Sequence, residues 1–231
     1  MKQPSCGTGK PKNQSITQSS SKIVEPQKIA TGLKANAKAP LIRCKTGLIV
    51  DACISATKIA WLLKHVRVAR ALARQTKLAF GTIDSWLIWK LIAGNKHVTD
   101  TSNASRAMLY NLSTDDWDPK LLRVFKILRN LLPEICGSSE VVGENKLLGK
   151  TIPIAGNAGD QKVALFEQCC TSPGMVKNTY GTGCFMLMNT GNKPIASKNN
   201  LLSTLAWCIN GRAEFALEGS IFIAGVDSMV T

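Results

Sequence analysis

The chain has 231 residues, of which 45% are hydrophobic, and this size allows one large or two small globular domains. No apolar run reaches the roughly 18 residues of a membrane-spanning helix. Met1 is followed by a polar stretch, which excludes an evident signal peptide. The eight cysteines lack Cys-x-x-Cys spacing and only two histidines accompany them, so the sequence disfavours a zinc site and is typical of reduced thiols in a cytoplasmic protein.

Positive charge is concentrated in the first third of the chain. Residues 1–80 hold 15 Lys or Arg against two acids, a net charge of +13, whereas residues 81–231 hold 14 against 13. Residues 1–42 are rich in polar residues, Pro and Gly without helical or strand periodicity, which predicts a basic, disordered tail. Lysines without interleaved aromatic residues favour at most nonspecific binding of polyanions, so no specific nucleic-acid partner is predicted.

From residue 46 onward the pattern becomes that of folded elements. Residues 46–51 are typical of a turn and a short extended piece, and residues 55–74 predict an amphipathic helix. The Asn210–Gly211 dipeptide predicts a tight hairpin turn. Further predicted elements, in chain order, are a helix capped near Thr82 or Asp84, helices over 116–131 and 162–170, a hairpin over 175–188, strands over 201–207 and 213–219, and the start of a helix over 221–226.

Two short glycine-bounded motifs indicate a chemical site. Residues 156–161 read Gly-Asn-Ala-Gly-Asp-Gln, which puts the Asp160 carboxylate on a turn that a substrate can approach closely and where it can accept a hydroxyl proton. Residues 178–185 read Asn-Thr-Tyr-Gly-Thr-Gly-Cys-Phe, and the turn at Thr182 points N–H groups and a hydroxyl outward, which suits phosphate oxygens. Singly, each motif is more often a helix cap or a plain hairpin turn.

Together, the two motifs resemble those of the glycerol kinases in the FGGY family of carbohydrate kinases. The resemblance runs from about Thr46 to Gly225 and includes the Thr-Ser-Asn-Ala-Ser-Arg stretch of residues 101–106. It implies an α/β, actin-like/ribonuclease H-like kinase fold of two domains with the ligands in the cleft between them. Residues 43–170 are then the remainder of the N-terminal domain, residues 171–231 are the start of the C-terminal domain, and residues 1–42 are the tail.

The resemblance also implies an activity and its residues. The reaction is the ATP-dependent phosphorylation of glycerol to sn-glycerol 3-phosphate, with ATP and Mg2+. The enzyme is expected to be a cytoplasmic homo-oligomer with no membrane partner. No side chain of this chain is expected to ligate a metal. Asp160 is the general base that takes the proton of the attacking glycerol hydroxyl, and Gln161 binds a glycerol hydroxyl. Thr182 and Gly225 contact the nucleotide. Cys53 stands where the family has a Tyr in the glycerol pocket, and it offers no phenol donor and less stacking area.

Several features of the family are not found in the sequence. No phosphate loop of the Asp-Gln-Gly-Thr-Thr-Ser type precedes Thr46, the Arg-Glu pair that grips glycerol is missing, Met229 replaces a nucleotide-contacting Gln, and the loop over residues 144–151 is shorter than the family's sugar-bisphosphate regulatory loop. Because phosphoryl transfer depends on positioning and charge stabilisation, we expect a truncated chain that is inactive alone. Two alternatives stay open: another FGGY sugar kinase, such as one for a pentulose, and a non-catalytic remnant with a polyanion-binding tail.

Overall fold

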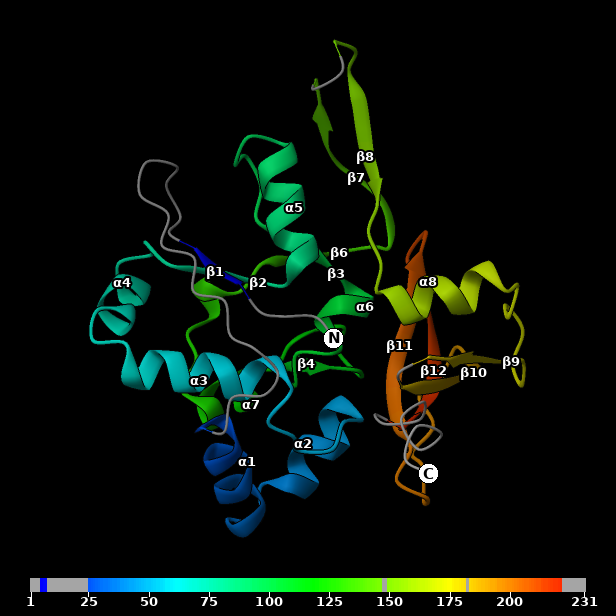
Figure 1. Cartoon of the computed structure of the whole chain (residues 1–231), viewed down its shortest axis with the longest axis horizontal. Coiled ribbons are helices and arrows are strands. Elements are labelled where there is room, and N and C mark those ends of the chain that lie inside the picture. Colours follow the sequence, from blue (N-terminus) through cyan, green and yellow to red (C-terminus); the bar gives the residue numbers. More distant parts are fainter. Residues whose placement is uncertain (1–4, 8–24, 147–148, 182, 222–231) are drawn as a thin grey trace, which may run out of the picture.

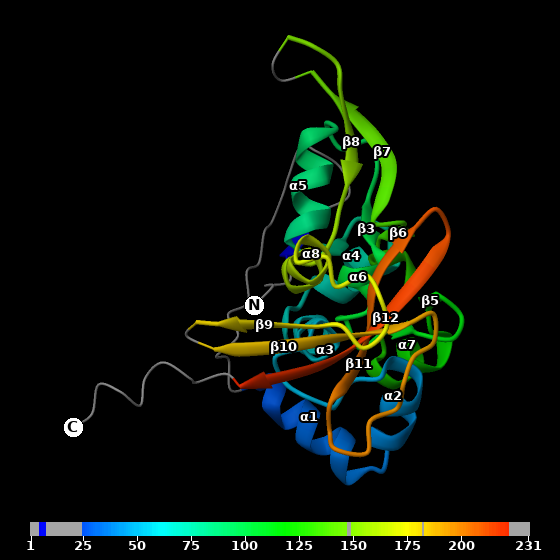
Figure 2. The same ribbon diagram turned by 90° about the vertical axis from the view of Figure 1, so that its right-hand side faces the viewer.

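The computed structural model describes residues 5–7, 25–146, 149–181 and 183–221. A helix-rich part lies beside an antiparallel sheet that carries one helix, and a long hairpin projects from their junction (Figures 1 and 2). The helices are α1 (Glu25–Ala35), α2 (Ala39–Thr46), α3 (Ser55–His65), α4 (Ala69–Arg74), α5 (Ile83–Leu91), α6 (Thr101–Ala104), α7 (Pro119–Phe125), α8 (Asp160–Glu167) and the 3-10 turn η1 (Arg129–Leu131). The strands are β1 (Ser5–Gly7), β2 (Ala79–Gly81), β3 (Val98–Asp100), β4 (Tyr110–Asn111), β5 (Asp116–Trp117), β6 (Glu134–Cys136), β7 (Ser139–Asn145), β8 (Ile152–Gly156), β9 (Val176–Tyr180), β10 (Cys184–Gly191), β11 (Leu202–Ile209) and β12 (Arg212–Ile221).

The largest sheet has four antiparallel strands in the order β11-β12-β10-β9. Asn210 and Gly211 join β11 to β12 with φ angles of 51° and 72°, which are the left-handed conformations that this dipeptide accepts. The outer side of β11 is bonded to the helix-rich part: the Ser203 N–H donates to the Gly47 carbonyl at 3.0 Å, and the Ser138 N–H donates to the Cys208 carbonyl at 2.7 Å. The other described sheets are two-stranded, and only β3 and β6 run parallel.

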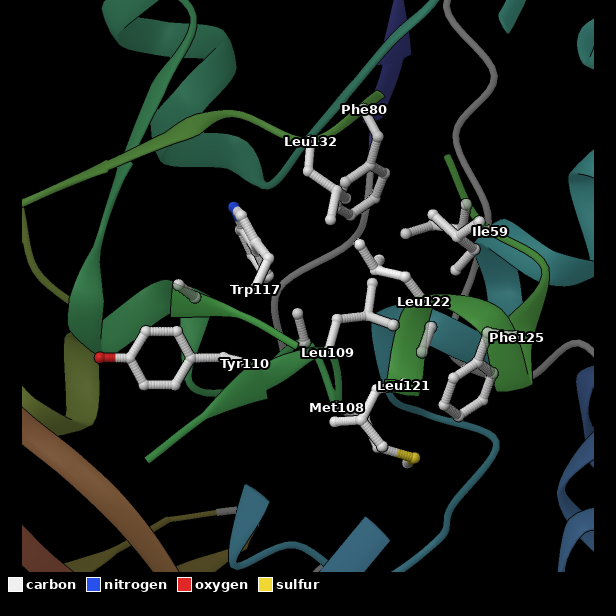
Figure 3. Packing of buried hydrophobic residues seen from close by; sticks show 14 of the residues in the cluster. Ile59, Phe80, Met108, Leu109, Tyr110, Trp117, Leu121, Leu122, Phe125 and Leu132 are labelled. Atoms are coloured by element: carbon white, nitrogen blue, oxygen red, sulfur yellow. The ribbon is translucent and has the colours of Figure 1, made fainter. Parts of the chain in front are cut away.

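Three apolar clusters lie among the described residues, and one of them joins α5 to the β7–β8 hairpin. The largest one fills the space between α1, α3, α7 and the β4–β5 pair, where Tyr110 meets Trp117 edge to face with ring centroids 6.4 Å apart (Figure 3). Another one joins Leu165 of α8 to the inner face of the four-stranded sheet, including Leu187 and Trp207. Helix α8 therefore packs on the sheet that follows it in the chain. The division into domains near residue 170 stays a prediction.

The prediction of a disordered tail is wrong for residues 25–42. These residues form α1 and the first half of α2, with Ala30 and Ile42 only 4% and 0% exposed. The mainly polar composition conceals a few apolar residues at helical spacing, and α1 gains its stability by packing these residues against α3. Residues 5–7 pair with β2 as strand β1, whereas residues 1–4 and 8–24 lie outside the described residues.

The helix predicted over residues 55–74 is two helices, α3 and α4. The break falls at residues 66–68, where Val66 adopts an extended conformation. The apolar stripe continues across the break, which explains why periodicity alone predicts one helix.

The helix predicted over residues 116–131 is shorter than expected. Residues 116–117 form β5, and Asp118 caps α7 by accepting the N–H groups of Lys120 and Leu121 at 2.8 and 3.0 Å. Lys126 ends α7 in a left-handed conformation with φ 54°. Of the helix predicted over residues 221–226, the structure describes only Ile221, and this residue is the last one of strand β12. Residues 222–226 lie outside the described range.

Within the described part of the chain, no helix combines the length and apolarity needed to cross a bilayer. The hairpin of β7 and β8 projects beyond the four-stranded sheet and lies beside α5 (Figures 1 and 2), where Val142 packs in one apolar cluster with Ile88 and Ile92. The loop over residues 144–151, which is shorter than the family's sugar-bisphosphate regulatory loop, connects the two strands of this hairpin. Residues 147–148 of this loop lie outside the described residues.

Candidate active site

Asp160 is the first residue of α8. Hydrogen bonds to the preceding turn, residues 157–159, fix its position. The Gly159 N–H donates to Ser102 Oγ at 2.8 Å, and the Asn157 N–H donates to the Ser138 carbonyl at 3.0 Å. The Asn157 side chain also donates to Asp84 Oδ2 at 3.2 Å. The turn is thus held on both sides, while the Asp160 side chain stays exposed at the positive end of the helix dipole, where a carboxylate is favoured.

A buried carboxylate organises the turn that supports Asp160. Asp100 is 0% exposed and accepts the N–H groups of Ser102 and Asn103 at 2.9 Å each, the Asn103 side-chain amide at 2.6 Å, and the Ser138 hydroxyl at 3.0 Å. Burial raises the pKa of Asp100, and these hydrogen bonds oppose that rise. Asp100 therefore braces the loop that supports Asp160.

A cleft of about 490 Å3 opens beside the N-terminus of α8. Its wall brings together Asp160, Gln161 and Cys53, three of the five residues for which the sequence predicts a role. The other two, Thr182 and Gly225, lie outside the described residues. A further cavity of about 50 Å3, between α3, α4 and β2, is lined by apolar side chains and offers no polar group for chemistry.

Cys53 forms part of the cleft wall as a partly buried thiol. Its N–H donates to Asp51 Oδ1 at 2.7 Å, which fixes the turn before α3. Burial, followed by the hydrogen bond and charge of Asp51, raises the pKa of the thiol. At neutral pH Cys53 therefore presents a small neutral group to the cleft.

An ion-pair network at the cleft was not predicted from the sequence. The Lys162 ammonium lies 2.6 Å from Glu218 Oε2, with each side chain 4% exposed, and Arg106 contacts both Glu218 oxygens at 3.2 and 3.1 Å. Burial alone would raise the pKa of Glu218, but Lys162 and Arg106 lower it to about 2. The network connects α8, the loop after α6 and strand β12. Arg106 thus reaches the sheet.

Lys177 of β9 is a second missed residue. It is 1% exposed, and its ammonium donates to Gln161 Oε1 at 2.5 Å and to Thr179 Oγ1 at 2.7 Å. Burial lowers its pKa, while the carboxylates of Glu218 and Asp160 act in the opposite direction. The sequence does carry a signal for Lys177 and Glu218, since each is a charged residue inside a segment with strand patterning. A charged side chain there indicates a buried ion pair or a functional site, because charges are rarely buried without a partner.

The arrangement suits a small ligand with hydroxyl groups. An exposed carboxylate stands beside a primary amide in a cleft whose base is an ion-pair network, so a hydroxyl proton has an acceptor at hand. Across residues 25–146, 149–181 and 183–221, no three His, Cys, Asp or Glu side chains gather in a way that would hold a metal ion.

Comparison with known proteins gives a consistent result. Residues 13–167 match the model of the N-terminal domain of the FGGY family of carbohydrate kinases. Glycerol kinase of Chromobacterium violaceum is 60% identical over 195 residues, which are 84% of this chain and 39% of that protein. Glycerol kinase of Xanthomonas campestris pv. campestris is 56% identical over 200 residues, 85% of this chain and 40% of that protein. The chain thus spans about two fifths of the length of these relatives.

Solved structures agree on the fold. The crystal structure of Plasmodium falciparum glycerol kinase with ADP matches 98% of this chain and 46% of that chain, with a TM-score of 0.89 and 32% sequence identity. A ligand-bound xylulose kinase from Lactobacillus acidophilus matches 97% of this chain and 45% of that chain, with a TM-score of 0.83, and at 21% identity it bears on the fold alone. The predicted α/β, actin-like kinase fold is confirmed. The family match begins at residue 13, inside the segment that was predicted to be a tail.

Proposed function

Because the chain belongs to the FGGY family of carbohydrate kinases, we propose that its protein transfers the terminal phosphoryl group of ATP to glycerol and forms sn-glycerol 3-phosphate. The observation that carries the proposal is the placement of Asp160 and Gln161 side by side in one cleft. Relatives named glycerol kinase that are 54–60% identical favour glycerol as the substrate. The ADP in the name of the Plasmodium falciparum structure favours an adenine nucleotide as the donor.

In the proposed reaction Asp160 is the general base. It accepts the proton of the attacking hydroxyl while that oxygen forms a bond to the terminal phosphorus, and the bond from phosphorus to the bridging oxygen of ADP breaks. Proton transfer to a positioned carboxylate typically contributes about 10²–10⁴ in rate. Gln161 binds a second hydroxyl, and two contacts to one small polyol fix its orientation.

The nucleotide belongs to the same proposal. Thr182 and Gly225 are proposed to contact it, and ATP is proposed to enter with Mg2+, which in phosphoryl transfer offsets the charge of the phosphate oxygens.

An ADP-release assay with Mg-ATP and glycerol tests the proposal. It is run on this chain and on any longer product that its gene encodes, and it also tests the expectation that the 231-residue chain alone does not turn over. We expect Asp160→Asn to lower kcat by about 10²–10⁴ with little effect on nucleotide binding. Glu167→Gln, an exposed acid at the other end of α8, is the matched control. Turnover that survives Asp160→Asn unchanged would remove Asp160 as the base.

One observation favours a second substrate. Cys53 lines the cleft where the family has a Tyr, so the proposed glycerol pocket lacks the stacking area and hydroxyl of that ring. The competing proposal is therefore another FGGY sugar kinase activity, such as one on a pentulose. The ratio of kcat/KM for glycerol to that for xylulose decides between them.

A cytoplasmic location and a homo-oligomeric assembly are also part of the proposal, since the family resemblance implies both. Cell fractionation tests the location, and analytical ultracentrifugation tests the assembly.

A further inference from the structure

Lys177 and Thr179 occupy the inward face of β9, whereas Val176, Asn178 and Tyr180 point outward and are exposed. An ammonium group on an inward face is costly to bury unless it is paired. The partners of Lys177 are the oxygens of Gln161 and Thr179, at 2.5 and 2.7 Å, whereas Glu218 is in direct contact with Lys162 and Arg106. The charge of Lys177 is thus directed at Gln161.

The contact determines which end of the Gln161 amide faces Lys177. An ammonium group can only donate hydrogen bonds, so the amide atom that it touches must be the oxygen. Gln161 also lines the cleft next to Asp160. With its oxygen held by Lys177, the group that Gln161 can offer to a ligand is its NH2.

We propose that Lys177 is a positioning residue that holds the Gln161 amide with its NH2 toward the cleft, so that Gln161 donates to one polyol hydroxyl while Asp160 accepts from another. The nature of the ligand rests on the proposed function. The orientation of Gln161 does not, because it follows from the donor-only chemistry of Lys177. Such a donor beside an acceptor selects a ligand with two neighbouring hydroxyl groups and discriminates against one that lacks either of them.

A ligand-free measurement tests the orientation. In 1H–15N NMR spectra of the full chain, the side-chain amide signals of Gln161 are assigned by their loss in Gln161→Leu. Lys177→Met should shift them by more than a line width, whereas Lys120→Met, an exposed lysine of α7, should leave them in place. Unchanged Gln161 signals in folded Lys177→Met would overturn the proposal.

Glycerol titrations test the consequence. Lys177→Met and Gln161→Glu should each weaken binding about three- to tenfold, the range expected for one positioned hydrogen bond. Gln161→Glu keeps an acceptor for Lys177 but removes the donor, so it decides the question even if Lys177→Met does not fold. In a Gln161→Leu background Lys177→Met should have no further effect, because the two residues act as one unit. A wild-type affinity in Gln161→Glu, or fully additive effects, would overturn the proposal. If the wild-type chain bound no glycerol, the proposed substrate would fail, while the ligand-free spectra would still decide the role of Lys177.

Discussion

Replacing Glu218 by Gln should destabilise the protein by removing the anion of the buried network. Gln is nearly isosteric with Glu, so the change leaves Lys162 and Arg106 facing a neutral group without opening a cavity. Lys162 is 4% exposed and would face a neutral amide in place of the carboxylate 2.6 Å away. Breaking a buried ion pair by removing the charge of one partner typically costs about 3–5 kcal/mol.

The pKa of Glu218 gives a comparable magnitude. A fall from 4.5 to about 2 on folding corresponds to about 3 kcal/mol that favours the folded state, and the side chain is too well buried for strong solvent screening. The folded-state pKa is the lower one, so this contribution is fully present above pH 4.5. It is lost as the pH falls from 4.5 toward 2.

Urea unfolding followed by circular dichroism measures the effect. At pH 7 we expect Glu218→Gln to lower the unfolding free energy by about 3 kcal/mol, and the difference from wild type should shrink below pH 4.5. Glu144→Gln, an exposed acid on β7, is the control and should change little. Equal stabilities for Glu218→Gln and Glu144→Gln at pH 7 would refute the reasoning.

Three further predictions concern single positions. Gly47→Ala should lower the free energy of unfolding by more than about 1–2 kcal/mol, as measured by thermal unfolding. Gly47 has φ 69°, and an added Cβ would lie 2.3 Å from the Ser203 carbonyl oxygen. In the control Gly211→Ala the added Cβ meets no atom within 4 Å, so the loss should be smaller. Asp118→Ala should cost about 1–2 kcal/mol or more through loss of the α7 cap and of the 2.6 Å contact to Lys45. Burial would raise the pKa of Asp118, but Lys45 and the cap hydrogen bonds hold it at about 2. The cost should therefore be full above pH 3.8 and should shrink as the pH falls from 3.8 toward 2. At neutral pH, a cost no larger than that of exposed Asp116→Ala would contradict this. Cys53→Tyr should tighten glycerol binding in a titration, because it adds a hydroxyl and apolar area to the cleft wall, and weaker binding would show that the cleft has no room for the ring.

Local sequence signals were sufficient where the structure depends on neighbours in the chain. The Asn210–Gly211 turn, the start of α5 after Thr82 and the strands on either side of Gly181 were predicted from residues within a few positions. Thr82 occupies the predicted cap position, but its side chain makes no capping hydrogen bond. The placement of Asp160 and Gln161 followed from a family motif rather than from any local rule. Their proximity to Cys53 could not be read from spacing, because about a hundred residues separate them in the chain.

The failures share one cause, which is dependence on contacts between distant parts of the chain. Helix α1 was missed because its mainly polar composition conceals the helical spacing of its few apolar residues, and its stability comes from packing on α3. Lys162 and Glu218 are 56 residues apart, and neither carries a local sign that it will meet the other. The role of Lys177 was missed for the same reason, since one of its two partners, Gln161, lies on α8 and not in its own hairpin.

The bonds between β11 and the helix-rich part have a consequence for the edges of the sheet. An edge strand normally exposes a row of backbone groups that can template the pairing of another strand. At β11 the Ser203 N–H and the Cys208 carbonyl are already occupied by the helix-rich part, so part of this edge is blocked. At the opposite edge, β9 pairs with no described strand other than β10, and Val176 and Tyr180 are 48% and 78% exposed there. Of the two described edges of this sheet, we therefore expect β9 rather than β11 to accept an added strand, whether from another segment of the protein or from a second molecule during aggregation.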